Sequence, residues 1–372
     1  MRVLILLDSS TDLEGDWRIQ TADGLMQASA RRDVATLIPR LDRSRVQLEI
    51  CTLRGGGQSI NARNWRDVAA LRRLTWLVRE RDIELIHALG PRALVYTMLA
   101  GRLTGIPTIA TCYDRVPLSH TDQAGIPQAV QAFARNMVRW GLDRLIVTSE
   151  LSMRSLASVR YPPQRIELIY PGIDVPDSPP PTPDRSALGL PNGPLATMIA
   201  PLTVDQGYDV LIDSVPRLLQ RVPNVHVAVL GTGPLLWKLQ QMAHAGSPLP
   251  ITWLGGRDDV QDIIRASNVI VVHPRKEGIP QALIEAAAGA RPAVSSRVAG
   301  ITEVIEPART GTLVTPGDSR DLAIQIGKYL LQPGWANRIG EAALRLARER
   351  FSLDRQCEAI TTLYEGTIYA SR

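Results

Sequence analysis

Short apolar runs alternate with helix-like segments along the first half of the chain. The predicted strands are VLILL, VQLEICT, ELIHAL, TIATC, RLIVTS and IELIY, and the predicted helices lie around residues 22–40, 65–81, 92–104, 127–141 and 150–159. Because these runs are apolar on both faces, they are typical of parallel strands that are covered by helices on both sides. The pattern predicts a doubly wound α/β domain over residues 1–175.

The same alternation begins again after a change of composition. Residues 176–193 contain the run SPPPTPDRSALGLPNG, which is predicted to be a stiff linker because proline cannot donate to a sheet. A second set of predicted strands then follows over residues 194–350: LATMIA, HVAVLG, ITWLG, NVIVVH, PAVSS and GTLV. Ligands of such sheets bind outside the carboxyl ends of the strands, so two such domains imply a cleft between facing strand ends.

Composition places the chain among ordinary water-soluble proteins. Its 372 residues suit two domains, with 21% charged and 45% apolar residues. The longest apolar runs fall short of the ~20 residues of a spanning helix, which favours a cytoplasmic protein. Cys51, Cys112 and Cys357 are widely separated and two lie in strand-like runs, so we expect buried reduced thiols and no metal site.

One stretch is rich in arginine. Residues 54–81 carry seven arginines against Asp67 and Glu80. Two interpretations stay open: peripheral contact with an anionic membrane or an acceptor, or a solvated helix face. In the second, the inward-packing residues would be Trp65, Val68, Leu71, Leu74 and Val78. No patch of basic and interleaved aromatic residues argues for binding of nucleic acid, which is therefore not an expected partner.

The segment from Glu277 to Glu303 carries the most specific chemistry. Two carboxylates, Glu277 and Glu285, stand eight residues apart around a Gly-Ile-Pro turn, and QALIEAAAG predicts a helix after that turn. Free backbone N–H groups and the positive end of the dipole suit a phosphate at the start of a helix. The carboxylates then suit hydroxyl groups of a sugar and a ribose. The alternative is a capped helix with Glu285 as a solvated surface residue.

This segment resembles the E-x7-E signature of retaining, nucleotide-sugar-dependent glycosyltransferases of the GT-B fold, family 4. Several other motifs support the resemblance: Gly289, Pro292 and Val294 as G-x-P-V, Gly300-Ile301 with Glu303, the turn from Val229 to Pro234, Leu254-Gly255 with Asp259-Val260, Tyr170 to Asp174, and Val147 to Glu150. It covers nearly the whole chain and is most specific over residues 225–315.

The resemblance implies two Rossmann-like domains that face a cleft, with a C-terminal helix over residues 351–372 that crosses back to the first domain. It also implies transfer of a sugar from a nucleoside diphosphate donor to a hydroxyl acceptor, which is a glycan, a lipid-linked molecule or a small molecule, with no cofactor and no metal. Glu277 would be the catalytic residue and would hold sugar hydroxyls. The backbone of Gly278, Ile279 and Pro280 would contact sugar and phosphate, and Glu285 the ribose.

Other positions follow the same pattern less closely. Gly233 belongs to the G-x-G-P turn and is expected on the donor side. Tyr113 and Asp114 stand where the family writes a T-x-H-D strand end, so Tyr113 replaces the usual histidine on the acceptor side. His87 ends a predicted strand and would contact the acceptor there, or else be structural.

The two basic residues that usually bind the donor's diphosphate in this family are missing here. Pro201 and Gln206 stand at the two positions that usually hold Arg and Lys, so we expect Arg275 and Lys276 to supply the charge, unless they are solvent-facing loop residues. A rival hypothesis is a catalytically degenerate relative that binds a nucleotide-sugar or glycan, or serves as a partner subunit. A dinucleotide-dependent oxidoreductase is disfavoured, since Leu236 replaces the third glycine of that fingerprint.

Overall fold

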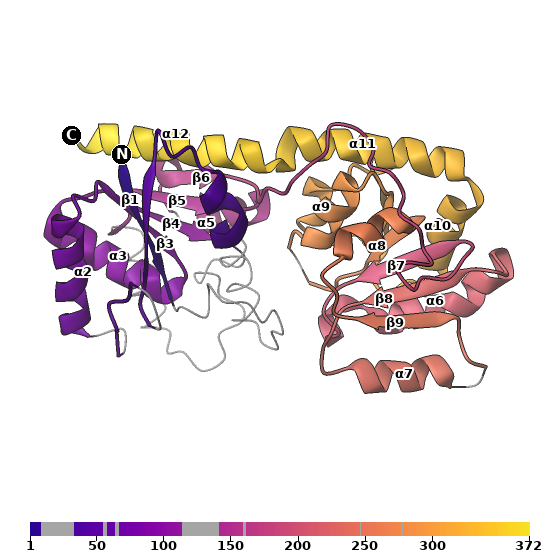
Figure 1. Ribbon diagram of the computed structural model, residues 1–372. Coiled ribbons are helices and arrows are strands. Elements are labelled where there is room, and N and C mark those ends of the chain that lie inside the picture. Colours follow the sequence, from indigo (N-terminus) through magenta and orange to yellow (C-terminus); the bar gives the residue numbers. More distant parts are fainter. Residues whose placement is uncertain are drawn as a thin grey trace. The chain divides into compact units, whose positions relative to one another are not determined.

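The structure is a computed structural model that describes residues 1–8, 33–54, 58–63, 67–113, 141–158, 161–245, 247–276 and 278–372 (Figure 1). It divides into two compact units. Unit 1 comprises Met1–Gly172 and Leu353–Arg372, and unit 2 comprises Ile173–Ser352. Each unit is built on one six-stranded parallel sheet with helices packed against it. This confirms the predicted fold class of two Rossmann-like α/β domains.

Unit 1 contains the sheet of order β2-β1-β3-β4-β5-β6. Its strands are β1 (Arg2–Leu7), β2 (Gln47–Thr52), β3 (Leu85–Leu89), β4 (Thr108–Cys112), β5 (Arg144–Val147) and β6 (Ile166–Leu168). Its helical elements are η2 (Asp33–Leu37), η3 (Ile38–Arg40), α2 (Val68–Glu80), α3 (Pro91–Thr104), α5 (Glu150–Ser158), η4 (Pro163–Arg165) and α12 (Leu353–Ser371). The predicted strands and the helices expected around residues 65–81, 92–104 and 150–159 are confirmed.

The two faces of this sheet are covered by different parts of the chain. Helices α2, α3 and α5 pack on one face through apolar residues such as Leu74, Tyr96 and Leu156. The opposite face packs against the C-terminal helix α12 through Leu353, Ile360 and other apolar residues. The first and last segments of the sequence therefore share one hydrophobic core.

One expected helix of unit 1 takes another form. The segment expected around residues 22–40 is described only from Asp33, where two short helical turns, η2 and η3, replace a continuous α-helix. Pro39 gives the physical reason, because it lacks a backbone N–H and its ring clashes with the preceding turn of an α-helix. The helix expected around residues 127–141 lies outside the described residues except for Gly141.

Unit 2 contains the sheet of order β12-β11-β10-β7-β8-β9. Its strands are β7 (Leu195–Ile199), β8 (His226–Leu230), β9 (Ile251–Gly255), β10 (Val269–Val272), β11 (Ala293–Ser296) and β12 (Thr312–Val314). Its helical elements are η5 (Val204–Gln206), α6 (Tyr208–Arg221), α7 (Leu236–His244), α8 (Val260–Ala266), α9 (Gln281–Ala288), η6 (Ile301–Glu303), α10 (Ser319–Leu331) and α11 (Pro333–Phe351).

The order of the strands in unit 2 creates a switch point. The chain runs from β7 outward through β8 to β9, and then returns to the other side of β7 with β10. Connections after β7 and β10 therefore leave the sheet in opposite directions. Open parallel sheets bind their ligands at this crevice, outside the carboxyl ends of the two strands.

The proline-rich stretch that was predicted to be a stiff linker belongs to unit 2. Arg185 donates to the carbonyl of Ala266 at 2.8 Å and to Oδ1 of Asn268 at 2.9 Å. Leu190 is buried in the small core that contains Leu195. The second half of the stretch thus packs onto the sheet, because its two leucines bury apolar surface and its arginine satisfies carbonyls at the end of α8.

Candidate active site

Two loops of unit 2 meet at the switch point. One follows β7 and leads through η5 into α6, and the other follows β10 and leads into α9. The backbone N–H of Arg275, in the second loop, donates to the carbonyl of Asp205, in the first loop, at 2.7 Å. The loops are therefore held together by backbone as well as by side chains.

A glycine and a buried histidine set the separation of these loops. Gly207 has a φ of +68°, and a Cβ there would lie 2.5 Å from the carbonyl oxygen and 2.7 Å from Nδ1 of His273. His273 is fully buried, and its ring nitrogens have no hydrogen-bond partner in the described ranges. Burial lowers the pKa of His273 below its ordinary value. The neutral imidazole of His273 thus packs directly against the first loop, and only a glycine at position 207 leaves room for this contact.

Arg275 and Lys276, the two cations expected to serve the diphosphate, are each ion-paired. Arg275 Nη2 lies 2.5 Å from Oδ2 of Asp209, and Lys276 Nζ lies 2.8 Å from Oδ2 of Asp205. All four side chains are partly exposed, and exposed pairs of this kind contribute only about 0.2–1 kcal/mol. An incoming anion could therefore replace either carboxylate at small cost. The sequence interpretation missed both carboxylates, although the switch-point rule brings the ends of β7 and β10 together.

The turn that precedes α9 rests on a second glycine. The N–H of Gly278 donates to the carbonyl of Ala299 at 3.0 Å. Gly300 has a φ of +92°, and a Cβ at this position would lie 2.5 Å from the carbonyl oxygen of Gly278. Pro280 is the N-cap of α9, and Ile279 lies between Gly278 and Pro280. The N–H of Leu283 donates to the carbonyl of Pro280 at 3.0 Å. Helix geometry leaves the N–H groups of Gln281 and Ala282, the first two of α9, without a partner inside the helix.

Glu285 lies on α9, one turn inside the helix. It is half-buried, and Nε2 of Gln281 donates to its Oε1 at 2.5 Å. Side chains of a helix lean toward its N-terminus, so this contact holds the carboxylate over the first turn of α9. Glu277, the predicted catalytic residue, lies outside the described residues.

The turn after β8 packs against the loop after β7. A Cβ at Gly233 would lie 2.5 Å from the carbonyl oxygen of Leu202, and the N–H of Leu202 donates to Thr232 at 2.9 Å. Gly233 thus permits close contact between two backbones at the candidate site. Pro201 is exposed and Gln206 half-exposed in the first loop.

His87, expected on the acceptor side or in a structural role, is a core residue of unit 1. It is 2% exposed, its Nδ1 lies 2.7 Å from the hydroxyl of Tyr364, and its Nε2 lies 2.7 Å from Oγ1 of Thr111. Because both nitrogens are engaged by the protein, the expectation of an acceptor contact is corrected in favour of the structural alternative. Tyr113 is also buried, in the core shared with α12, and its role on the acceptor side stays a prediction. Asp114 lies outside the described residues.

The burial of His87 predicts a pH-dependent stability. Burial lowers the pKa of His87 to about 3, whereas an unfolded chain has a histidine pKa of about 6.5. Between these values only the unfolded chain binds the proton, so this contribution is present above pH 6.5 and is lost as pH falls toward 3. We expect a loss of roughly 2 kcal/mol of unfolding free energy between pH 7 and pH 5. Denaturant titrations at both pH values should show a smaller loss for His87→Gln; an equal loss in both proteins would contradict the assignment.

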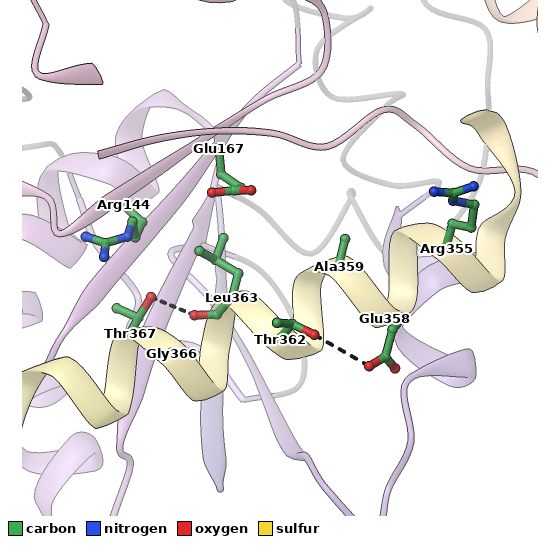
Figure 2. Close-up of a pocket in the computed structure, with 9 residues that line it drawn as sticks. All are labelled: Arg144, Glu167, Arg355, Glu358, Ala359, Thr362, Leu363, Gly366 and Thr367. Atoms are coloured by element: carbon green, nitrogen blue, oxygen red, sulfur yellow. Dashed lines mark hydrogen bonds between the residues drawn. The ribbon is translucent and has the colours of Figure 1, made fainter. Parts of the chain in front are cut away.

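A hollow of about 570 Å³ lies beside α12 in unit 1 (Figure 2). It is lined by Arg144, Glu167, Arg355, Glu358, Ala359, Thr362, Leu363, Gly366 and Thr367. Arg144 is the first residue of β5, and Glu167 lies on the edge strand β6, so the hollow is away from the carboxyl end of the sheet. Its lining also carries arginines and glutamates, but it is not at the carboxyl ends of parallel strands, where such sheets bind their ligands.

The remaining features of the described ranges concern disulfides, metal sites and membrane-spanning helices. The three cysteines are buried and free, as predicted. His, Cys, Asp and Glu side chains do not gather into a group suited to a metal ion within the parts of the chain described above. In the same parts, every helix is too short or too polar to cross a membrane.

Each half of the chain matches a family of glycosyltransferases. Residues 22–176 match the family described as Glycosyltransferase Family 4, and residues 193–332 match the family described as Glycosyl transferases group 1. A relative in Mycolicibacterium smegmatis, a GDP-mannose-dependent alpha-(1-6)-phosphatidylinositol monomannoside mannosyltransferase, is 28% identical over 321 residues, 79% of each chain.

Solved structures show the same fold. Anabaena Alr3699/HepE in complex with UDP superposes with a TM-score of 0.76 at 19% identity and covers 98% of this chain and 100% of its own. The same protein in complex with UDP-glucose gives a TM-score of 0.74 at 20% identity, over 97% and 99% of the two chains.

Proposed function

Since this chain is a glycosyltransferase of the GT-B fold, we propose that it transfers a sugar from a nucleoside diphosphate sugar to a hydroxyl acceptor, with retention of anomeric configuration and without a metal or cofactor. One observation carries the proposal. At the switch point of unit 2, the loop after β7 is joined to the loop after β10, which leads into α9, the element that bears the second carboxylate of the E-x7-E segment.

The donor half of the proposal has two kinds of support. The mycobacterial relative is named for its dependence on GDP-mannose, and the Anabaena structures contain UDP or UDP-glucose. In our proposal the turn at Gly278 and the first N–H groups of α9 receive the diphosphate, because a helix N-terminus favours an anion. Glu285 accepts hydrogen bonds from the ribose, and Glu277 from the hydroxyls of the donor sugar.

A second function is favoured by the ion pairs at the same site. Arg275 and Lys276 are matched by Asp209 and Asp205, so these four groups sum to no net charge. Pro201 and Gln206 add none. A protein that binds a nucleotide-sugar or glycan without turnover, or that supports a catalytic partner, would fit this balance. The two functions differ in one respect, which is release of nucleoside diphosphate.

The test combines binding and turnover. Calorimetry with UDP, GDP and ADP should identify one nucleotide that binds wild type, and its sugar derivatives should release nucleoside diphosphate in the presence of acceptor. Glu285→Ala should weaken nucleotide binding by about 1.5–3 kcal/mol, since it removes a charge-assisted hydrogen bond. Glu341→Ala, an exposed glutamate on α11, is the matched control and should bind as wild type does.

The outcomes separate the hypotheses. Product whose anomeric configuration matches the donor supports retention, and inverted product excludes it. Binding without release of nucleoside diphosphate from any sugar derivative supports the non-catalytic function. If no nucleotide binds, or if Glu285→Ala binds as tightly as wild type, the donor site is wrongly placed.

A further inference from the structure

Exposed apolar side chains gather on two neighbouring helices of unit 1. Val68 and Trp76 on α2 are 68% and 62% exposed, and Leu103 at the end of α3 is 58% exposed. The expectation that Val68 packs inward is therefore wrong. Leu74 and Val78 are buried as expected, together with Ala70 and Leu77, and Leu71 is partly buried against the same core. Trp65 lies outside the described residues.

These side chains form one continuous stripe with arginines between them. Val68, Arg72, Trp76 and Arg79 are spaced by four, four and three residues, so they follow a single face of α2. Arg79 Nη2 donates to the carbonyl of Leu103 at 3.3 Å, which places the end of α3 beside this face. Figure 1 shows α2 alongside α3. We define the α2–α3 patch as Val68, Arg72, Trp76, Arg79, Arg102 and Leu103.

The charge of the patch is positive. Arg72, Arg79 and Arg102 are all exposed, and α2 contains a single acidic residue, Glu80. Within the described ranges, Arg72 and Arg79 have no carboxylate at ion-pair distance. Arg73 turns away from the stripe and donates to the carbonyl of Ile60 at 2.8 Å. Two of the three patch arginines thus keep their charge available to an external anion.

We propose that the α2–α3 patch docks unit 1 on the surface of an anionic lipid bilayer. Trp is the side chain that favours the boundary between headgroups and acyl chains, and Val68 and Leu103 extend the same apolar area. Arginines beside them reach the lipid phosphates, to which guanidinium groups bind in a bidentate manner. An amphipathic face of this composition lies in the plane of the interface. This inference is independent of the proposed transfer reaction.

Sedimentation with lipid vesicles tests the proposal. Wild type should sediment with vesicles of phosphatidylcholine and phosphatidylglycerol, but not with phosphatidylcholine alone, and binding should fall as salt screens the charges. Each arginine near an anionic surface is expected to contribute roughly fivefold. Arg72→Gln with Arg79→Gln should therefore weaken binding by roughly twenty-fivefold. The matched control is Arg338→Gln with Arg345→Gln, an exposed pair at the same spacing on α11 of unit 2, which should leave binding unchanged.

A second measurement places the tryptophan. Dibrominated lipid should quench part of the wild-type fluorescence when vesicles are added. Trp76→Phe should lose that quenching, whereas Trp237→Phe, which alters a 73% exposed tryptophan of unit 2, should keep it. Absence of wild-type binding to anionic vesicles overturns the proposal and leaves an acidic protein as the partner class. Equal weakening by both arginine pairs, or quenching that survives Trp76→Phe, also overturns it.

Discussion

Gly300→Ala is expected to lower sugar transfer by roughly 100-fold or more while the protein stays folded, because it displaces the turn that precedes α9. The new Cβ would lie 2.5 Å from the carbonyl oxygen of Gly278 and 3.2 Å from its Cα. These are backbone atoms, so no flexible side chain can yield. A misplacement of about 1 Å at a reacting centre costs on the order of 10²-fold. Steady-state kinetics and nucleotide calorimetry on the purified variant measure the effect.

Gly317→Ala provides the matched control. Gly317 has a φ of +82°, close to the +92° of Gly300, but its added Cβ would have no neighbour within 4 Å. Both variants should lose about 1–2 kcal/mol of stability from the left-handed backbone. Gly300→Ala should lose more, because its Cβ also meets the backbone of Gly278. Only Gly300→Ala should lose transfer. If both lose it equally, backbone strain and not the turn explains the effect.

Arg275→Ala with Lys276→Ala is expected to reduce transfer by about 10⁴-fold, since each preorganised charge at a departing group contributes about 10²- to 10³-fold. Asp205→Asn with Asp209→Asn is expected to act in the opposite direction on nucleotide binding. It frees both cations from the carboxylates that hold them at 2.8 Å and 2.5 Å, and removes two negative charges from the loops where we propose that the diphosphate binds. Calorimetry with the nucleoside diphosphate measures both variants.

The control for this pair is Arg320→Ala with Lys328→Ala, one exposed arginine and one exposed lysine on α10 of the same unit. It carries the same loss of charge and should leave both binding and transfer unchanged. Full activity in the Arg275 and Lys276 variant would show that the diphosphate charge is met elsewhere. Weaker binding in the Asp205 and Asp209 variant would show that the carboxylates shape the loop and do not compete with the ligand.

The strands were predictable because parallel strands buried on both faces leave uninterrupted apolar runs, such as VLILL and NVIVVH. The break at Pro39 was not anticipated, although proline removes a backbone donor and its ring clashes with the preceding turn. Proline is only a weak guide to helix ends here, because Pro216 lies inside α6. The exposure of Val68 was not predicted either, because helical spacing fixes the relative positions of side chains but not where the buried face begins. The local pattern thus predicted the helices and strands, but it did not determine which face of a helix points toward the core.

The site was predictable only in part, for a related reason. The start of α9 and the glycines around it follow from local sequence. The pairing of Lys276 with Asp205 joins residues 71 positions apart, and the contact of His87 with Tyr364 joins residues 277 apart. No periodicity encodes such contacts, which depend on strand order and on the return of the last helix.

The position of α12 has a consequence for biosynthesis. Residues near the start of the chain, Val3, Ile5 and Leu7, bury one face of the first sheet against Ile360 and Tyr364 near its end. During translation, the whole of unit 2 leaves the ribosome before that helix does. Domains generally fold as units, so unit 2 can complete its core while this face of the earlier unit is still uncovered. Synthesis of unit 1 therefore begins before that of unit 2, but the core of unit 1 is completed only after the whole of unit 2 has been made.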